Sequence, residues 1–344
     1  PVKGKAAKGR LTQEGAYAIM GRLALFTKHY DEAIEAYNHV IGKYSLFKSG
    51  DGTDGYKNYS ELFTEANEEC NEVILGIHYA GPGLNEGQTF SISWGGPMNG
   101  IEATRNLCDD YYCTDGLPID KSPLFKGKTG KAAYDKDHPD FARYENRDPR
   151  LKGTLFVPGM KWLNDTYDYD KTTNPDGKKI PSASQVAIMK WFVPENMANE
   201  YDGSHDYYVI RYAEVLLSLS EAMIEKGGYS QDQITKYINE VRQRVNMPKV
   251  EDVEGKGLSQ EQLRQIVRHE RRVELAFEDL RFADLYRWGE WKNAVERMNK
   301  EFETYGAGDY ERSYRGAQDE VWPIPQNEID TDKNLKQHKE WGGE

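Results

Sequence analysis

The residues of this chain that could do chemistry do not form a familiar catalytic motif. The sequence contains no glycine-rich phosphate loop, no GxSxG nucleophile elbow and no Walker motif. His269-Glu270 lacks the second histidine of the zinc-protease motif, and no CxxC pair occurs. A carboxylate pair for glycoside hydrolysis stays open, because such a pair is defined by its separation in space. We expect no enzyme activity, no catalytic residues, no metal and no cofactor, with a glycan-active enzyme as an alternative.

Aromatic side chains in a glycine-rich loop favour ligand binding instead. Trp94 and Phe90 lie in the loop 80–100, and Asn99 offers both a hydrogen-bond donor and an acceptor. A sugar ring presents a C–H face that stacks on an aromatic ring, while its hydroxyls seek polar partners. The alternative is that Phe90 and Trp94 tuck under the loop as a small core. The candidate ligand-binding residues are Trp94, Phe90, Asn99, Tyr79 and Trp162.

A turn-rich stretch further on carries oxygen-bearing side chains. Asp168, Asp170, Asn174 and Asp176 could hold calcium, but their spacing misses the EF-hand template. Asp and Asn are the residues that turns use, so a solvated turn is the favoured interpretation.

The three cysteines are too few for a disulfide scaffold. Cys108 and Cys113 could pair and leave Cys70 free. Because free cysteine is often buried as a small apolar residue, three idle or buried thiols are the favoured interpretation.

Length and charge limit the class of protein. The chain has 344 residues, and 45 Lys and Arg against 57 Asp and Glu give a net charge of −12. That excess repels phosphate backbones and argues against nucleic-acid binding. No run approaches the roughly 18–20 apolar residues of a membrane helix. Aromatic residues make up 12% of the chain, which is enough to build a core.

Two helix pairs must position these residues. Apolar residues recur at helical spacing across 11–47, and the pattern fits one tetratricopeptide repeat. A second pair is expected at 208–248, as helices 208–226 and 230–246. One repeat cannot bury its own apolar face, so the two pairs should pack together. The residues expected to be buried in the first pair are Tyr17, Met20, Gly21, Ala33 and Tyr37.

The rest of the chain is expected to be less regular. Residues 72–206 read as a loop-rich binding region after a strand at 73–79. Residues 259–290 read as a C-terminal helix opened by a capping box at Ser259. Its segment 268–272 (RHERR) fits a salt-bridged helix face better than a catalytic or phosphate-binding cluster. Two prolines make 318–335 an extended strap, which we expect Trp322 to pack.

Several strings together resemble the SusD/RagB family. They include the RHERRVELAFE string at 268–278, with flanking residues, and the WPIPQNEID string at 322–330. The DPRL turn at 148–151 and the DG-x-P turn at 115–118 agree, as does the helix pair after residue 8. These strings run from residue 8 to 341.

The resemblance implies a fold and a role. It implies one mostly α-helical domain over residues 1–344, with tetratricopeptide-like helix pairs, a loop-rich ligand region and few strands. It also implies a non-catalytic, glycan-binding lipoprotein on the external face of the outer membrane, which partners a SusC-like TonB-dependent transporter. A peptide-binding lid of the same transporter type is the alternative. The chain begins at Pro1, so we expect an N-terminally incomplete sequence that lacks its lipid anchor.

Overall fold

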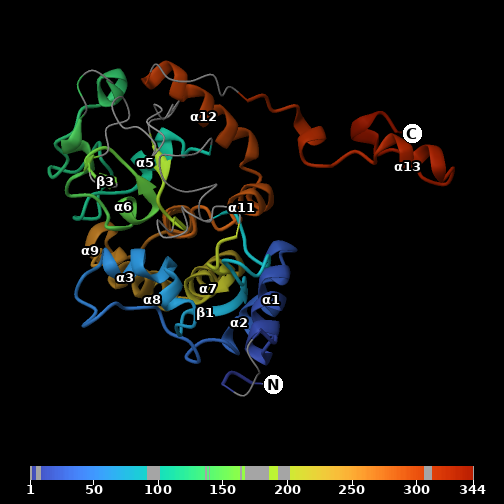
Figure 1. The fold of residues 1–344 in the computed structure, drawn as a ribbon, viewed down its shortest axis with the longest axis horizontal. Coiled ribbons are helices and arrows are strands. Elements are labelled where there is room, and N and C mark those ends of the chain that lie inside the picture. The colour runs from blue at the N-terminus through green and yellow to red at the C-terminus, as the bar shows by residue number, and fades with distance from the viewer. Residues whose placement is uncertain are drawn as a thin grey trace.

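The chain is described here from a computed structural model. The structure describes residues 2–4, 9–90, 101–135, 138, 140–162, 165–166, 186–192, 202–305 and 312–343. Within these ranges the molecule is mostly helical, as expected, with few and short strands. Figure 1 shows the helices of both chain halves packed side by side and a C-terminal segment that extends away from them.

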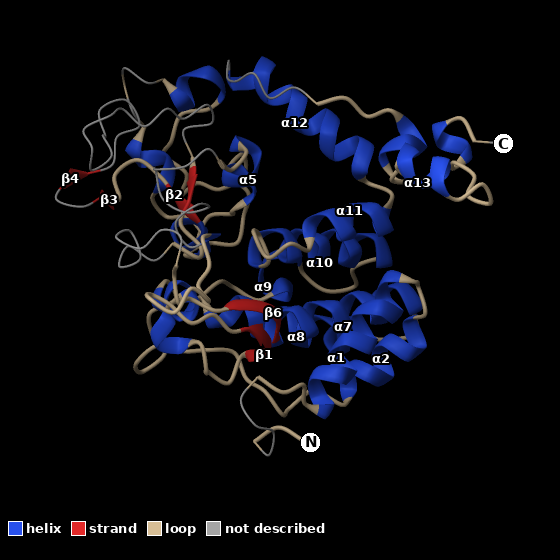
Figure 2. Cartoon of the chain, turned by 45° about the vertical axis from the view of Figure 1, so that its right-hand side comes forward, coloured by secondary structure: helices blue, strands red, loops and turns tan. Residues whose placement is uncertain are grey.

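Helix pairs stack in layers to form the scaffold. Helices α1 and α2 pack against α7, which also contacts α8 and α10. Figure 2 shows these layers one above the other, with α12 on the far side of α10 and α11. The two expected pairs are therefore present and in contact, although about 170 residues separate them. The helices are α1 (Gln13–Phe26), α2 (Tyr30–Asn38), α7 (Tyr212–Lys226), α8 (Gln231–Arg244), α10 (Gln260–Glu274), α11 (Arg281–Trp288) and α12 (Trp291–Tyr305).

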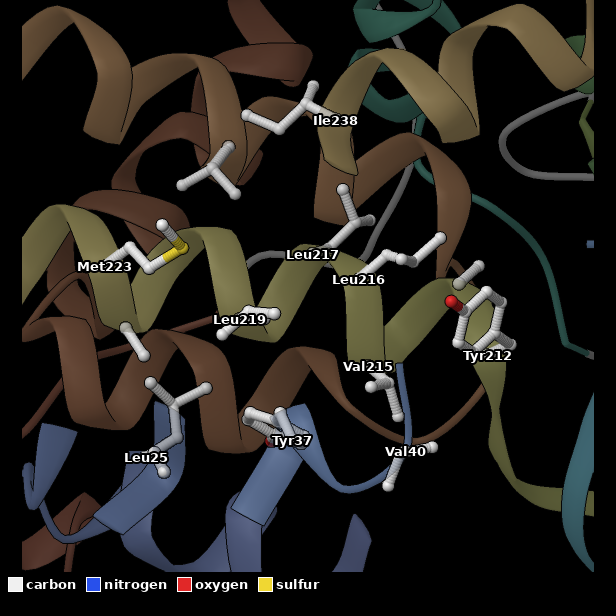
Figure 3. Packing of buried hydrophobic residues seen from close by; sticks show 14 of the residues in the cluster. Leu25, Tyr37, Val40, Tyr212, Val215, Leu216, Leu217, Leu219, Met223 and Ile238 are labelled. Carbon is white, nitrogen blue, oxygen red and sulfur yellow. The ribbon is translucent and has the colours of Figure 1, made fainter. Parts of the chain in front are cut away.

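The main core lies between the first two layers. Figure 3 shows Leu25 and Tyr37 of the first pair facing apolar side chains of α7. A Cβ atom on Gly21 would lie 2.6 Å from Cε1 of Tyr37, which is too close for any other residue without a shift. Gly21 therefore sets the close approach of α1 and α2, as the sequence predicts.

One residue expected in this core lies outside it. Met20 is 45% exposed, so the prediction of its burial is wrong, and Tyr17 is only partly buried beside a stacked His39 ring. Because α1 is the outermost helix of the described layers, only one face of it meets a neighbour. Ala33 and Tyr37 are buried as predicted.

A short two-stranded sheet joins the two halves of the chain. Strand β1 (Val73–Ile77) pairs antiparallel with β6 (Tyr207–Arg211). The helix predicted to start at 208 is wrong at that end, since α7 begins only at Tyr212. The run YVIR suits either state, and pairing with β1 decides for the strand. The other strands are β2 (Leu155–Phe156) with β5 (Ala187–Ile188), and β3 (Lys161–Trp162) with β4 (Asp165–Thr166).

Short helices lie within the loop-rich region and in the segments before and after it in the sequence. They are α3 (Lys57–Ser60), α5 (Arg105–Asp110), α6 (Arg150–Thr154) and α9 (Val250–Glu254), with 3-10 turns at 61–63, 65–67, 130–134 and 141–144. Cys108 and Cys113 are buried thiols, and Cys70 is a partly exposed one.

The C-terminal part departs from expectation in two places. The single helix predicted at 259–290 is broken into α10 and α11 by a turn in which Phe277 and Asp279 adopt positive φ values near 60°. The capping box at Ser259 is present. Residues 321–325 are non-helical, but α13 (Gln326–Thr331) follows, and Trp322 is 84% exposed. The prediction that Trp322 packs the strap is therefore wrong.

A buried charge network ties the loop-rich region to the helix layers. It contains five cations and five carboxylates, so its formal charge is zero, and each side chain is at most 7% exposed. Glu274 of α10 stands at its centre and accepts from Arg150, Arg211 and Arg244 at 2.6–3.0 Å. The members are Glu72, Asp148, Arg150, Lys190, Arg211, Arg242, Arg244, Glu270, Glu274 and Glu278.

The network explains the charged string of α10. Glu270 pairs with Arg150 and Arg242, while Arg271 pairs with Asp284 of α11. Burial alone would raise the pKa of the Glu274 carboxyl, but the surrounding guanidinium groups hold that pKa well below its usual range. The expected salt-bridged face is thus confirmed, and much of it lies in the interior rather than at the surface.

Candidate ligand-binding site

The loop after β1 is fixed by one carboxylate. Asp202 accepts hydrogen bonds from the backbone N–H groups of Gly83 at 2.5 Å and Gly87 at 3.0 Å. A Cβ atom at Gly81 or Gly87 would lie within 2.4 Å of Asp202, so the glycines permit this close approach. Gln88 then exchanges two backbone hydrogen bonds of 2.9 Å with Gly203. The entry to the predicted binding loop is therefore tied to the chain just before β6.

Phe90 ends this anchored stretch inside an aromatic cluster. Its side chain is 7% exposed, and its ring meets Trp191 edge-on at 5.9 Å between centroids and Tyr207 at 5.6 Å. Trp191 is itself 1% exposed and donates its indole N–H to the carbonyl of Phe277 at 2.8 Å. Of the two interpretations of Phe90, the structure favours a place in a small core beneath the loop, where the ring has little free face for a ligand.

Tyr79 is brought close to Phe90. The two rings meet edge-on at 5.9 Å, and Tyr79 is only partly buried. The carboxylate of Asp206 accepts from the Tyr79 backbone N–H at 3.0 Å and contacts Nδ1 of His78 at 2.5 Å. The strand end that carries Tyr79 is therefore held rigidly, so Tyr79 can present part of its ring beside the loop.

The remaining candidates fall beyond what can be described. Trp94 and Asn99 lie outside the described residues, as do Asp168, Asp170, Asn174 and Asp176. The backbone of Trp162 forms β3 with Lys161, and Figures 1 and 2 both show β3 apart from β1. The structure thus brings Tyr79 and Phe90 together and places the backbone of Trp162 elsewhere.

A buried histidine lies beneath the same loop. His205 is fully buried and its ring lies 5.6 Å from Trp191 and 6.1 Å from Phe90. Burial lowers the pKa of this imidazole to about 4, against the smaller opposing effects of Glu65 and Asp206. His205 is therefore neutral at pH 7, and its protonation works against the folded aromatic cluster.

The structure also contains a cavity that the sequence did not predict. A cavity of about 520 Å3 lies between α5, α10, α11 and α12, and we name it the arginine pocket. Its walls come from segments far apart in the sequence, and the break between α10 and α11 forms one of them. In the sequence, the only sign of this cavity is the set of apolar residues among the charged residues of 268–288. The lining includes Ala103, Asn106, Leu107, Arg272, Phe277, Arg281, Phe282, Leu285, Ala294 and Arg297.

Two further features of the described residues concern metal ions and membranes. Across the described ranges, no cluster of three or more His, Cys, Asp or Glu is arranged to hold a metal ion. Among the helices that the structure describes, none has the length and apolar character needed to cross a membrane.

Known proteins resemble this chain in both sequence and fold. The model of the SusD family matches residues 48–341. A curated SusD-like protein of Formosa agariphila is 30% identical over 142 residues, which cover 40% of this chain and 26% of that protein. A SusD-like protein of Bacteroides fragilis has a TM-score of 0.74 at 25% identity, covering 97% of this chain and 66% of the other.

A second solved structure gives the same picture. It is a SusD-like carbohydrate-binding protein of Bacteroides fragilis, with a TM-score of 0.75 and 25% identity over 98% of this chain and 67% of the other. The chain therefore spans about two thirds of the length of these solved relatives, and its match spans about a quarter of the curated one. Because the family model covers more than half of the sequence, the chain belongs to the SusD family.

Proposed function

We propose that this chain forms part of a non-catalytic protein that binds glycans at the cell surface and delivers them to a SusC-like TonB-dependent transporter in the outer membrane. The match of residues 48–341 to the SusD family carries the proposal. One solved relative at 25% identity is described as a carbohydrate-binding protein, which supports a glycan as the ligand. A lipid anchor would hold the protein at the external face of the membrane.

The anchored loop gives the proposal a location. Asp202 and Gly203 fix residues 81–88, so the segment that follows starts from a defined point next to the partly exposed Tyr79. Trp94 is the proposed stacking anchor, since the buried Phe90 has little free ring face for a ligand. Asn99 would serve the sugar hydroxyls, and Trp162 is the more distant candidate.

Calorimetry with a bound glycan tests Trp94. Affinity electrophoresis against a panel of polysaccharides first identifies a ligand of the chain. Truncation of a binding anchor costs about 2 kcal/mol or more, which is roughly a thirtyfold loss of affinity for Trp94→Ala. Trp322→Ala is the matched control, because Trp322 is exposed on the segment that extends from the body, and it should leave affinity unchanged.

Three outcomes count against the proposal. Unchanged affinity of a folded Trp94→Ala protein removes Trp94 as the anchor and leaves Trp162 as the next ring to test. Release of reducing ends from the bound glycan by the pure protein, in proportion to its concentration, argues for a glycan-active enzyme instead. If no polysaccharide of the panel retards the chain in the gel, the glycan-binding proposal is wrong for residues 1–344.

A further inference from the structure

The arginine pocket is built as a small-molecule site. Its volume of about 520 Å3 lies within the roughly 300–1,000 Å3 of typical ligand sites. Apolar side chains form most of its wall, and charged groups enter from α10, α11 and α12. The frame is rigid, because Glu301 of α12 accepts from the backbone N–H groups of Arg105 at 3.0 Å and Asn106 at 2.6 Å. The anion at this helix start locks α12 onto α5.

One side of the pocket carries more cations than anions. Arg272 and Arg297 both pair with a single carboxylate, Asp110, and Arg272 also donates to the side-chain oxygen of Asn106 at 2.7 Å. These two guanidinium groups hold the pKa of Asp110 below its usual range, although burial opposes them. Arg281 lines the same wall as the third guanidinium. Two of these three cations therefore share one carboxylate, and the third does not pair with it.

Arg281 forms no direct ion pair in the described part of the chain. Its Nε is buried and lacks a hydrogen-bond acceptor there. Burial, and then repulsion by Arg272, lower the pKa of Arg281 to about 10 against weaker attraction by Asp284 and Asp110, so it is still charged at pH 7. By contrast, Arg271 and Arg287 are neutralised by Asp284 at 2.8 Å each. A partly buried cation without a counter-ion is costly, and a bound anion removes that cost.

The other carboxylates of the pocket do not fill this role. Asp284 is shared by two arginines, and Glu102 already has a partner. Asp279 is exposed to solvent, where water screens its charge, and it forms no ion pair with the described cations.

We propose that the arginine pocket binds an amphipathic carboxylate, whose charged end pairs with Arg281 beside Arg272 and whose apolar body packs on the wall formed by Phe282. The apolar wall disfavours a sugar, because the hydroxyls of a sugar ring need polar partners that apolar residues cannot provide. The proposal does not depend on the glycan-binding function. The body of the ligand is about the size of a blocked aromatic amino acid.

Calorimetry on the full chain at low salt tests the proposal with four probes. N-acetyl-phenylalanine carries the carboxylate and the apolar body, and N-acetyl-phenylalaninamide carries the body alone. Glucuronate carries the carboxylate on a sugar, and sodium sulfate is an anion without a body. A charge-assisted bond to a partly buried arginine predicts that the acid binds about tenfold or more tighter than its amide. Glucuronate and sulfate should bind more weakly than the acid.

Variants place the binding in the pocket. Arg281→Gln should weaken binding of the acid about tenfold while leaving the amide unchanged. Ala294→Phe fills the cavity without altering any charge and should abolish binding of both. Lys292→Gln is the control, because Lys292 lies on α12, is exposed and does not line the pocket. It removes one positive charge and should change affinity less than twofold.

Each contrary result overturns a different part of the proposal. Equal affinity for acid and amide, or an Arg281→Gln protein that binds the acid normally, removes Arg281 as the anion partner. Glucuronate binding as tightly as the acid shows an acidic-sugar site and overturns the apolar-body argument. Absence of binding by the acid at millimolar concentration overturns the proposal as a whole.

Discussion

Removing the central carboxylate of the buried network should destabilise the chain severely. Glu274 is fully buried, and its two oxygens accept from Arg150 at 3.0 Å, Arg211 at 2.7 Å and Arg244 at 2.6 and 2.7 Å. Glu274→Gln preserves the side-chain volume but leaves the network with five cations and four carboxylates. It also turns an amide N–H group toward guanidinium donors.

The magnitude follows from the burial of the partners. Breaking a buried ion pair by removing one member costs about 3–5 kcal/mol, because an uncompensated charge stays in the interior. We expect a loss of that size in the free energy of unfolding of Glu274→Gln. A chain of ordinary stability, about 5–15 kcal/mol, would lose a large part of its margin. The equilibrium unfolding curve in urea at pH 7, followed by circular dichroism and by tryptophan fluorescence, measures this loss.

Two further variants separate charge from other effects. Glu261→Gln removes a carboxylate from the same helix, but Glu261 is 61% exposed and pairs at the surface with Arg264, so the unfolding curve should change little. Arg150→Met in the Glu274→Gln background restores equal numbers of cations and carboxylates. The double variant should therefore lose less stability than the sum of the single variants, by about 1–3 kcal/mol. A Glu274→Gln loss as small as that of Glu261→Gln would refute the reasoning.

Two other predictions concern packing and pH. The Cβ of Gly21→Ala would meet the Tyr37 ring at 2.6 Å, so urea unfolding should show a loss of about 1–3 kcal/mol, whereas Met20→Ala on the exposed face should stay within about 0.5 kcal/mol. Because the pKa of His205 is about 4 in the folded chain and about 6.5 when unfolded, the unfolded state binds more protons between these values. Stability should thus fall by about 2–3 kcal/mol from pH 7 to 4.5. His205→Phe should remove much of that fall in stability. His138→Asn, at an exposed histidine, should retain it. Equal pH profiles for the wild type and both variants would contradict the assignment to His205.

The elements that the sequence predicts well are those that local patterning determines. Helical spacing and the required smallness of Gly21 identify α1 and α2, and the capping box at Ser259 marks the start of α10. The five apolar-rich residues of β1 are also recognisable as a strand. In each case the residues that decide the structure lie within a few positions of one another.

The errors arise where distant partners decide. The strand state of 208–211 depends on β1, more than 130 residues earlier. The break after α10 depends on backbone carbonyls of Glu274 and Ala276 that accept from the ammonium group of Lys190 at 3.1 and 2.8 Å. Met20 and Trp322 carry apolar side chains at exposed positions, and composition alone cannot separate such residues from core residues.

The same dependence on distant partners explains why the sequence indicates a loop after β1 but not the contacts that fix it. Glycines and aromatic residues mark a loop, but only Asp202, more than 100 residues later, shows which backbone N–H groups are fixed. Its neighbour Asp206 holds the strand end at Tyr79, and the chain then continues into β6 and the charge network through Arg211. The loop entry, the aromatic cluster and the buried charges are therefore parts of one connected support. A ligand ring at the loop would rest on a base whose positions are set by charges in the interior, so damage at Glu274 should reach the loop through Arg211 and β6.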